Sequence, residues 1–234
     1  ALGDSITTGY GLGEGEQSFA EIIAAENGYE LINLAEDGAT SADLLDVIQN
    51  EANAATLENA DLITITIGGN DLMGAMYEYL ADGTDQTAEQ IQAALMEGDM
   101  AALTAAIGKI SGFIESEQYN AALINISSNL SYSLHALQDI NDDVHMIVMK
   151  QYNPYSHLAA GMDLVDAFET SLIELNWLID FIGDKLYSVA DVYRAFANAD
   201  QNPCNAYFTS IMDFNLDFHP NAYGHTLIAE EILS

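Results

Sequence analysis

Four short motifs follow one another along the chain, and each contains residue types that ester chemistry requires. They are Gly3-Asp4-Ser5-Ile6-Thr7, Gly38, Gly68-Gly69-Asn70-Asp71 and Asp217-Phe218-His219-Pro220. A serine hydroxyl can act as a nucleophile, N–H groups can stabilise an oxyanion, and an imidazole can move a proton. Together the four motifs predict acyl transfer through a serine.

Ser5 follows a predicted strand in a Gly-Asp-Ser turn. Gly3 accommodates unusual backbone dihedral angles, and a serine at a helix start presents its own N–H to the same space as its hydroxyl. We predict that Ser5 is the nucleophile and that Asp4 borders the substrate. The alternative is an ordinary turn, because glycine, aspartate and serine are common turn residues.

Asn70 follows the near-continuous β-branched strand predicted at residues 61–67. Its side-chain amide can donate to an oxyanion, and Gly69 lets the backbone approach a substrate closely. Alternatively, the Asn70-Asp71 pair caps a helix that is predicted to begin near Leu72. We assign the capping to Asp71 and the cleft to Asn70.

His219 is the histidine whose neighbours restrict its backbone most. Pro220 disfavours the α conformation at the preceding residue, so His219 should be extended. If Phe218 is extended too, Asp217 and His219 project to the same side. The carboxylate can then orient the imidazole, whose other nitrogen faces Ser5. The alternative is a surface or packing position, which we expect for the other histidines: His135, His145, His157 and His225.

The composition excludes several classes of partner. The chain of 234 residues carries 37 acidic and four basic side chains, for a formal charge of -33. Such a charge repels nucleic acid and anionic membranes. No apolar run approaches the ~18 to 20 residues of a membrane span. We therefore expect no nucleic-acid partner, no stable membrane insertion and a monomer.

No sequence pattern indicates a metal site or a phosphate loop. Paired cysteines, an HExxH motif and a calcium-loop pattern are absent from the sequence. The glycine-rich run 9–15 lacks a Lys-Ser/Thr ending, and Glu14 and Glu16 would repel phosphate, so we expect a plain loop. Cys204 is the sole cysteine. It can form no internal disulfide, and we expect a buried thiol.

Predicted strands alternate with predicted helices, which favours a parallel sheet covered on both faces. We expect five strands, at residues 1–2, 31–34, 61–67, 144–149 and 186–192. The expected helices span residues 18–27, 41–57 (with Ser41 as the N-cap), 164–182 and 222–233, with a helical insertion at 72–140. Residues that follow the strands gather at one edge of such a sheet. The length predicts one domain, residues 1–234, whose first strand is truncated at the N-terminus.

The four motifs resemble the four blocks of the GDSL, or SGNH, hydrolase family in their order and in their spread along the chain. The residues that carry the resemblance are Gly3-Asp4-Ser5, Gly38, Gly69-Asn70-Asp71 and His219. The resemblance is to bacterial GDSL-like lipases and acylhydrolases, which cleave esters of lipids, acetylated sugars and small alcohols. It implies a flavodoxin-like three-layer α/β/α sandwich without a cofactor. It also implies Ser5 as nucleophile, His219 as base, and an oxyanion hole from the Ser5 and Gly38 N–H groups with the Asn70 side chain.

One block departs from the family pattern. The family places an aspartate three residues before the histidine, where this chain has Leu216. Asp217 is the best candidate for the third catalytic residue, with Asp213 or a backbone carbonyl as substitutes. The Tyr152-Asn153-Pro154-Tyr155 turn resembles a variant in bacterial members, so Tyr152 and Asn153 should border the cleft.

The sequence therefore predicts a serine ester hydrolase at an extracellular or cell-surface location, with the cytoplasm left open. A non-catalytic binding module on the same fold, and a thioesterase or acyltransferase, remain as alternatives. The residues that shape acyl preference are also open. Apolar side chains follow the Gly-Gly-Asn-Asp turn and could line an acyl pocket or form ordinary core: Met73, Met76, Tyr77 and Tyr79.

Overall fold

The computed structural model describes residues 1–158, 163–182, 186–210 and 213–234. A parallel sheet lies at its centre, in the order β1 (Leu2–Gly3), β2 (Leu62–Thr66), β3 (His145–Met149) and β4 (Ser188–Ala190). The strands β2 and β3 are almost wholly buried. Burial on both faces explains why their sequences are continuous β-branched and apolar runs.

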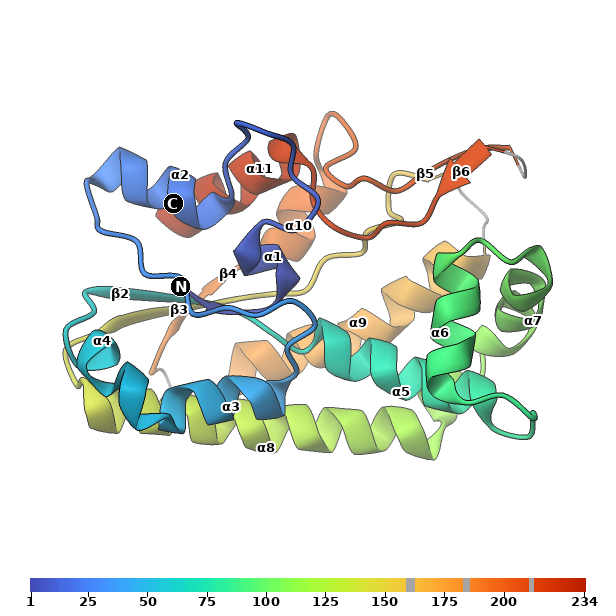
Figure 1. Ribbon diagram of the computed structural model, residues 1–234, viewed down its shortest axis with the longest axis horizontal. Helices are drawn as coiled ribbons and strands as arrows, with labels where there is room; N and C mark the ends of the chain where they lie inside the picture. The colour runs from blue at the N-terminus through green and yellow to red at the C-terminus, as the bar shows by residue number, and fades with distance from the viewer. Residues whose placement is uncertain (159–162, 183–185, 211–212) are drawn as a thin grey trace.

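Helices cover both faces of the sheet (Figure 1). On one side lie α2 (Phe19–Asn27), α10 (Val192–Ala197) and α11 (Ala222–Leu233); on the other lie α3 (Ser41–Gln49), α4 (Ala54–Glu58), α8 (Glu117–Ile140) and α9 (Asp163–Phe181). Each side has its own buried apolar cluster, one around Phe19 and Phe196 and the other around Ile126 and Leu175. The predicted α/β/α sandwich is confirmed.

The described sheet has four strands, so the prediction of a fifth at residues 31–34 is wrong. This segment runs beside β1, because the Leu34 N–H donates to the Ala1 carbonyl at 2.9 Å and the Ala1 amine donates to the Ile32 carbonyl at 2.8 Å. A further bond joins the Glu36 N–H to the Gly3 carbonyl at 3.1 Å. Since β1 offers only two residues, the pairing is too short to form a regular strand.

The helix predicted at 41–57 is broken into three pieces. Thr40, rather than Ser41, is the N-cap of α3, where it forms a capping box with Asp43. The helix ends at Gln49 because the Asn50 side chain accepts the Ala52 N–H and starts a 3₁₀ turn, η1 (Glu51–Asn53), before α4. A local side-chain bond therefore competes successfully with helix continuation.

Only helices and turns connect β2 to β3 in this fully described segment, as predicted. They are α5 (Gly69–Ala81), α6 (Ala88–Met96), α7 (Met100–Ile110), the 3₁₀ turn η2 (Phe113–Glu115) and α8. An antiparallel hairpin of β5 (Tyr207–Ser210) and β6 (Asp213–Asn215) lies near α6 and α7 (Figure 1). No pattern in the sequence predicted this hairpin.

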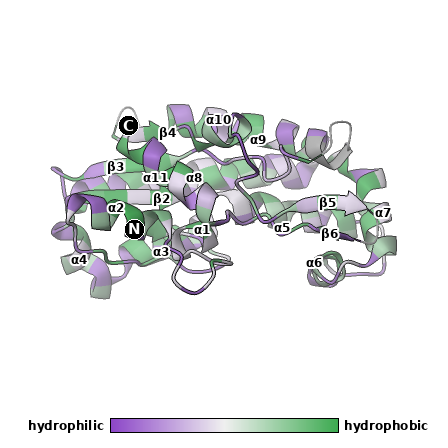
Figure 2. Cartoon of the chain, turned by 90° about the horizontal axis from the view of Figure 1, so that it is seen from above, coloured by the Kyte–Doolittle hydropathy of each residue, from purple (hydrophilic) through white to green (hydrophobic). Residues whose placement is uncertain are grey.

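The helices that cover the sheet carry both apolar and polar residues, which Figure 2 shows in green and purple. This pattern is typical of helices that pack one face on a sheet. Within the described ranges, no helix has the length and apolar character needed to cross a bilayer.

Candidate active site

Ser5, His219 and Asp217 form a hydrogen-bonded series, although 214 residues separate the first two. The Ser5 Oγ lies 2.9 Å from the His219 Nε2, and the His219 Nδ1 lies 2.6 Å from an Asp217 carboxylate oxygen. The Asp217 carboxylate also accepts the His219 backbone N–H at 3.1 Å. Asp217 and His219 thus project to the same side, as the extended Phe218-His219 geometry predicts.

The turn before Ser5 is fixed by close packing against β2. Gly3 has a φ of +127°, and a Cβ at this position would lie 2.1 Å from the Thr66 carbonyl oxygen. Glycine is therefore required here. Asp4 caps the short helix α1 (Ser5–Thr8) through the Ile6 N–H and accepts the Thr66 hydroxyl at 2.7 Å. Ser5 consequently begins a helix directly after a strand.

Asp4 is buried beneath the site. Burial raises the pKa of its carboxyl to about 6, against the opposing effects of the Thr66 hydroxyl, the Ile6 N–H and the charge of His219. Because these partners are donors, the ionised form retains hydrogen bonds in spite of its burial.

Two tyrosines hold the segment that carries His219. The Tyr152 hydroxyl donates to the Phe218 carbonyl and the Tyr155 hydroxyl to the Leu216 carbonyl, each at 3.0 Å. On the other side, the Asn205 N–H donates to the His219 carbonyl at 2.9 Å. The position of the imidazole is therefore set by backbone contacts on both sides of the segment.

Asp217 remains ionised at neutral pH. Burial alone would raise its pKa, but hydrogen bonds with the side chain and backbone of His219, the charge of His219 and a hydrogen bond from Asn205 bring the pKa below its usual value. The Asn205 amide nitrogen lies 3.2 Å from the second carboxylate oxygen. Asp213, the substitute considered from the sequence, lies in β6 and accepts a hydrogen bond from Thr209 instead.

The three predicted oxyanion donors lie around the Ser5 turn and the start of α5. The Asn70 Nδ2 donates one hydrogen bond to the Ala39 carbonyl at 2.9 Å, which leaves its second N–H for another acceptor. Gly38 precedes Ala39 in a turn with a φ of +80°. Neither the Ser5 N–H nor the Gly38 N–H donates to another residue in the described part of the chain.

Asp71 does not cap α5, so that prediction is wrong. The helix begins at Gly69, with Gly68 as its N-cap, and Asp71 lies inside the first turn. Its carboxylate accepts the Ser41 hydroxyl at 2.7 Å and the Ser41 N–H at 2.9 Å. Asp71 therefore attaches the start of α3 to α5, on the side of the site that carries Gly38 and Asn70.

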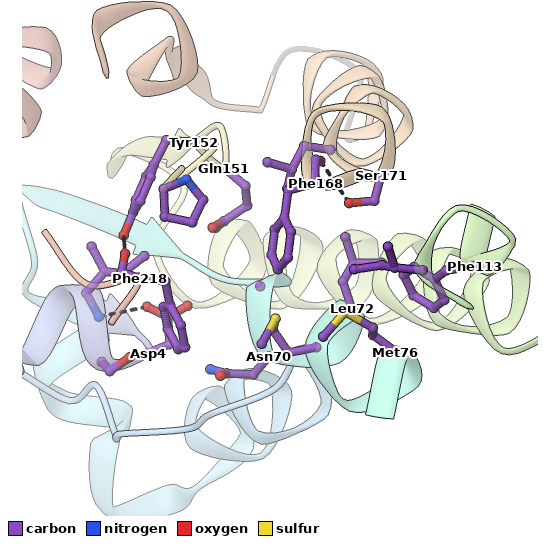
Figure 3. A pocket seen from close by; sticks show the side chains of 17 residues that line it. Asp4, Asn70, Leu72, Met76, Phe113, Gln151, Tyr152, Phe168, Ser171 and Phe218 are labelled. Atoms are coloured by element: carbon purple, nitrogen blue, oxygen red, sulfur yellow. Dashed lines mark hydrogen bonds between the residues drawn. The ribbon is translucent and has the colours of Figure 1, made fainter. Parts of the chain in front are cut away.

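A small cavity of about 70 Å³ opens beside Ser5. Figure 3 shows Asp4 and Asn70 toward one end of it and Leu72, Met76 and Phe113 toward the other. Of the predicted substrate-binding residues, Asp4, Gly69 and Tyr152 line the cavity. Asn153 and Gly38 are not among its described lining residues. The Asn153 side chain instead donates to Glu169 and accepts the Tyr155 N–H, both at 3.0 Å.

Sequence reasoning missed three residues near the site. Gln151 lines the cavity and donates to the Ile67 carbonyl at 3.0 Å, and Asn205 supports Asp217. The Tyr10 ring lies 4.5 Å from the His219 ring. Gln151 lies two residues after the end of β3, a position from which it could have been predicted. Asn205 and Tyr10 lie in irregular segments, whose sequences give no such indication.

Two other titratable side chains, those of His225 and Cys204, are buried. His225 is fully buried, accepts the Phe19 N–H at its Nδ1 and has its pKa lowered by burial to about 4. Cys204 is a buried free thiol, as expected, and burial raises its pKa. Among the residues that the structure describes, no three His, Cys, Asp or Glu side chains gather as a metal site would require.

Known proteins share this fold over nearly the whole chain. The structure aligns with the lipase Lip_vut3 from a goat rumen metagenome at a TM-score of 0.66, with 19% identity over 99% of this chain and 93% of that one. It aligns with phospholipase A1 from Streptomyces albidoflavus NA297 at 0.62, with 20% identity over 96% and 92%. A lipase from Streptomyces rimosus aligns at 0.60, with 18% identity over 96% and 93%.

The sequence comparisons agree with the fold. The uncharacterised protein YpmR of Bacillus subtilis (strain 168) is 23% identical over 241 aligned positions, which cover 99% of this chain and 78% of that protein. The GDSL-like lipase/acylhydrolase family matches residues 1–227. Since this match includes all four motifs, the chain belongs to the GDSL-like lipase/acylhydrolase family.

Proposed function

We propose that the chain is a serine ester hydrolase that works through an acyl-enzyme on Ser5. The observation that carries this proposal is the pair of contacts on the two ring nitrogens of His219, 2.9 Å to the Ser5 Oγ and 2.6 Å to Asp217. The His219 Nε2 can therefore accept the proton of the Ser5 hydroxyl, while the Asp217 carboxylate holds the ring through its Nδ1.

In the first half of the reaction, the Ser5 Oγ attacks the ester carbonyl carbon while its proton passes to the His219 Nε2. The tetrahedral intermediate then collapses, the bond to the alcohol oxygen breaks, and His219 returns the proton to the departing alkoxide. In the second half, water takes the place of the alcohol and the carboxylic acid is released. Asp217, ionised at neutral pH, orients and stabilises the imidazolium in both halves.

The Ser5 N–H, the Gly38 N–H and the Asn70 Nδ2 are the proposed oxyanion donors. Support comes from the free backbone N–H groups of Ser5 and Gly38 within the described structure, and from the bond that fixes the Asn70 amide on Ala39. Donors that are already oriented stabilise the developing negative charge without reorganising.

A non-catalytic binding module would not need the Ser5–His219–Asp217 series, so its intact geometry favours an enzyme. The cavity beside Ser5 favours an ester whose acyl part is apolar, because its lining is largely Met, Leu, Ile and Phe side chains.

The S. rimosus neighbour is described as an extracellular lipase. We extend that location to this chain as part of the proposal.

The test is hydrolysis of p-nitrophenyl esters from acetate to palmitate by the wild type and two serine variants. Ser5→Ala should abolish turnover of every ester. Ser133→Ala is the matched control, because Ser133 is buried in α8 and its hydroxyl has no hydrogen-bond partner in the described structure. Turnover that survives Ser5→Ala, or folded wild type without turnover, contradicts the proposal.

A further inference from the structure

A second, larger cavity meets the site from the other side. It has a volume of about 520 Å³ and lies between the helices α5 to α7 and the segment 214–219. Its lining includes His219 and Asp217 but neither Ser5 nor Asn70, whereas the 70 Å³ cavity is lined by Ser5 and Asn70 but not by His219. We name them the groove and the pocket.

A common wall separates the two cavities. It consists of the side chains that line both: Met73, Met76, Ile110, Phe168 and Phe218. At the far end of the groove, the hairpin approaches the insertion, since a Cβ at Gly98 would lie 3.8 Å from the Phe214 ring. The pocket and the groove therefore lie on the two sides of this wall, with Ser5 lining the pocket and His219 lining the groove.

The stereochemistry of acyl transfer assigns a part of the ester to each side. The leaving oxygen must receive its proton from the His219 Nε2, so the alcohol lies on the histidine side. The carbonyl oxygen faces the oxyanion donors, and the acyl chain occupies the remaining direction. In this site the histidine side is the groove, and the Ser5–Asn70 side is the pocket.

We propose, on the basis of the proposed esterase function, that the substrate joins a short acyl group to a long apolar alcohol. The pocket suits the shorter of the two chains, because its volume of about 70 Å³ is far below the 520 Å³ of the groove. The groove is several times larger and is lined mainly by apolar side chains of the insertion, such as Leu95, Leu103 and Ile107. Tyr77 lines the groove too, while Tyr79 binds the Lys109 carbonyl and belongs to the scaffold of the insertion.

The experiment compares two isomeric esters, octyl acetate and ethyl octanoate. Both have the same formula and nearly the same hydrophobicity, but the long chain lies on the alcohol in the first and on the acyl group in the second. We expect kcat/KM for octyl acetate to be at least ~10-fold higher, because each methylene that finds an apolar site contributes about fourfold. A ratio near one, or a preference for ethyl octanoate, overturns the assignment.

A variant pair locates the selectivity. Leu103→Trp narrows the groove and should lower the octyl acetate to ethyl octanoate ratio at least ~5-fold, since the added ring removes space for several methylenes. Ile124→Trp, on the exposed side of α8 and outside both linings, is the matched control and should leave the ratio unchanged. If folded Leu103→Trp has the same octyl acetate to ethyl octanoate ratio as the wild type, the assignment of the alcohol to the groove is overturned. If that variant does not fold, the ratio measured for the wild type decides whether the assignment holds.

The outcome separates this inference from the proposed function. Turnover of both isomers with the reverse preference contradicts only the assignment of the two cavities. Folded protein that hydrolyses neither isomer nor any p-nitrophenyl ester contradicts the esterase itself, and the inference with it.

Discussion

One proton transfer depends on three side chains, those of Ser5, His219 and Asp217. Because their roles differ, we expect their removal to lower kcat by different factors. His219 moves the proton, whereas Asp217 orients the ring that moves it. We expect His219→Ala to lower kcat by ~10⁶-fold and Asp217→Ala by ~10⁴-fold, as in hydrolases with such a triad. Steady-state kinetics of the two variants measures the difference.

Asp213→Ala is the control for this comparison, because Asp213 accepts a hydrogen bond from Thr209 in the hairpin rather than contacting His219. Its kcat should stay within about twofold of the wild type. A larger loss from Asp213→Ala than from Asp217→Ala would show that the wrong carboxylate has been assigned to the imidazole.

Asn70 contributes one donor to the proposed oxyanion hole. Asn70→Ala should lower kcat by ~10² to 10³-fold, the usual effect of one lost donor, with a much smaller change in KM. Asn120→Ala, which removes an exposed asparagine on α8, should have no effect on either constant. Equal kcat values for the two variants would remove Asn70 from the reaction.

At the scale of single elements, His225 joins α11 to the first residue of α2. Its Nδ1 accepts the Phe19 N–H at 3.2 Å, and burial lowers its pKa from 6.5 to about 4. The folded state therefore holds a neutral imidazole that the unfolded chain would protonate. Stability is lost as the pH falls from 6.5 toward 4, up to about 3 kcal/mol.

Unfolding in urea at several pH values, compared between the wild type and His225→Asn, measures this loss. Asp4, whose pKa burial raises to about 6, acts in the opposite direction, because it favours the folded state as the pH falls from 6 toward 3.8. The difference between the two proteins removes this shared effect. If the difference is independent of pH, His225 is not the titrating group.

Long periodic elements could be predicted from the sequence, and short ones could not. The strands β2 and β3 and the helices α2, α9 and α11 have continuous apolar patterns, and the structure has them close to the predicted residues. The break after Gln49 depends on one side chain, Asn50, which accepts the Ala52 N–H. The hairpin consists of β5, an exposed strand of four residues, and β6, a partly exposed strand of three residues, both too short for an alternating pattern.

At the site, too, local patterns could predict only contacts between neighbours in the sequence. The rule for residues before proline, together with an extended Phe218, predicted that Asp217 and His219 share a side, and the contact between the two side chains agrees. The contacts of Asp71 with Ser41 and of Tyr152 with Phe218 join residues 30 and 66 positions apart. Such contacts depend on how the elements pack, which no local pattern contains.

At the scale of the whole molecule, the formal charge of -33 opposes folding. Like charges on a compact surface repel one another, and salt shortens the distance over which they do so, from ~30 Å at 0.01 M to ~3 Å at 1 M. We expect Tm to rise by about 3 to 10 °C between these concentrations of NaCl. A Tm that is indifferent to salt would mean that the acidic side chains are already neutralised locally.

The central claim, that Ser5 is an activated nucleophile, is tested most directly by covalent labelling with a fluorophosphonate followed by peptide mass spectrometry. Only a hydroxyl activated by a neighbouring base attacks such a phosphorus centre. We predict one label per chain, on Ser5, in the wild type and in Ser133→Ala, and none in Ser5→Ala or His219→Ala. Labelling of another residue, or no labelling of the folded wild type, would contradict the account.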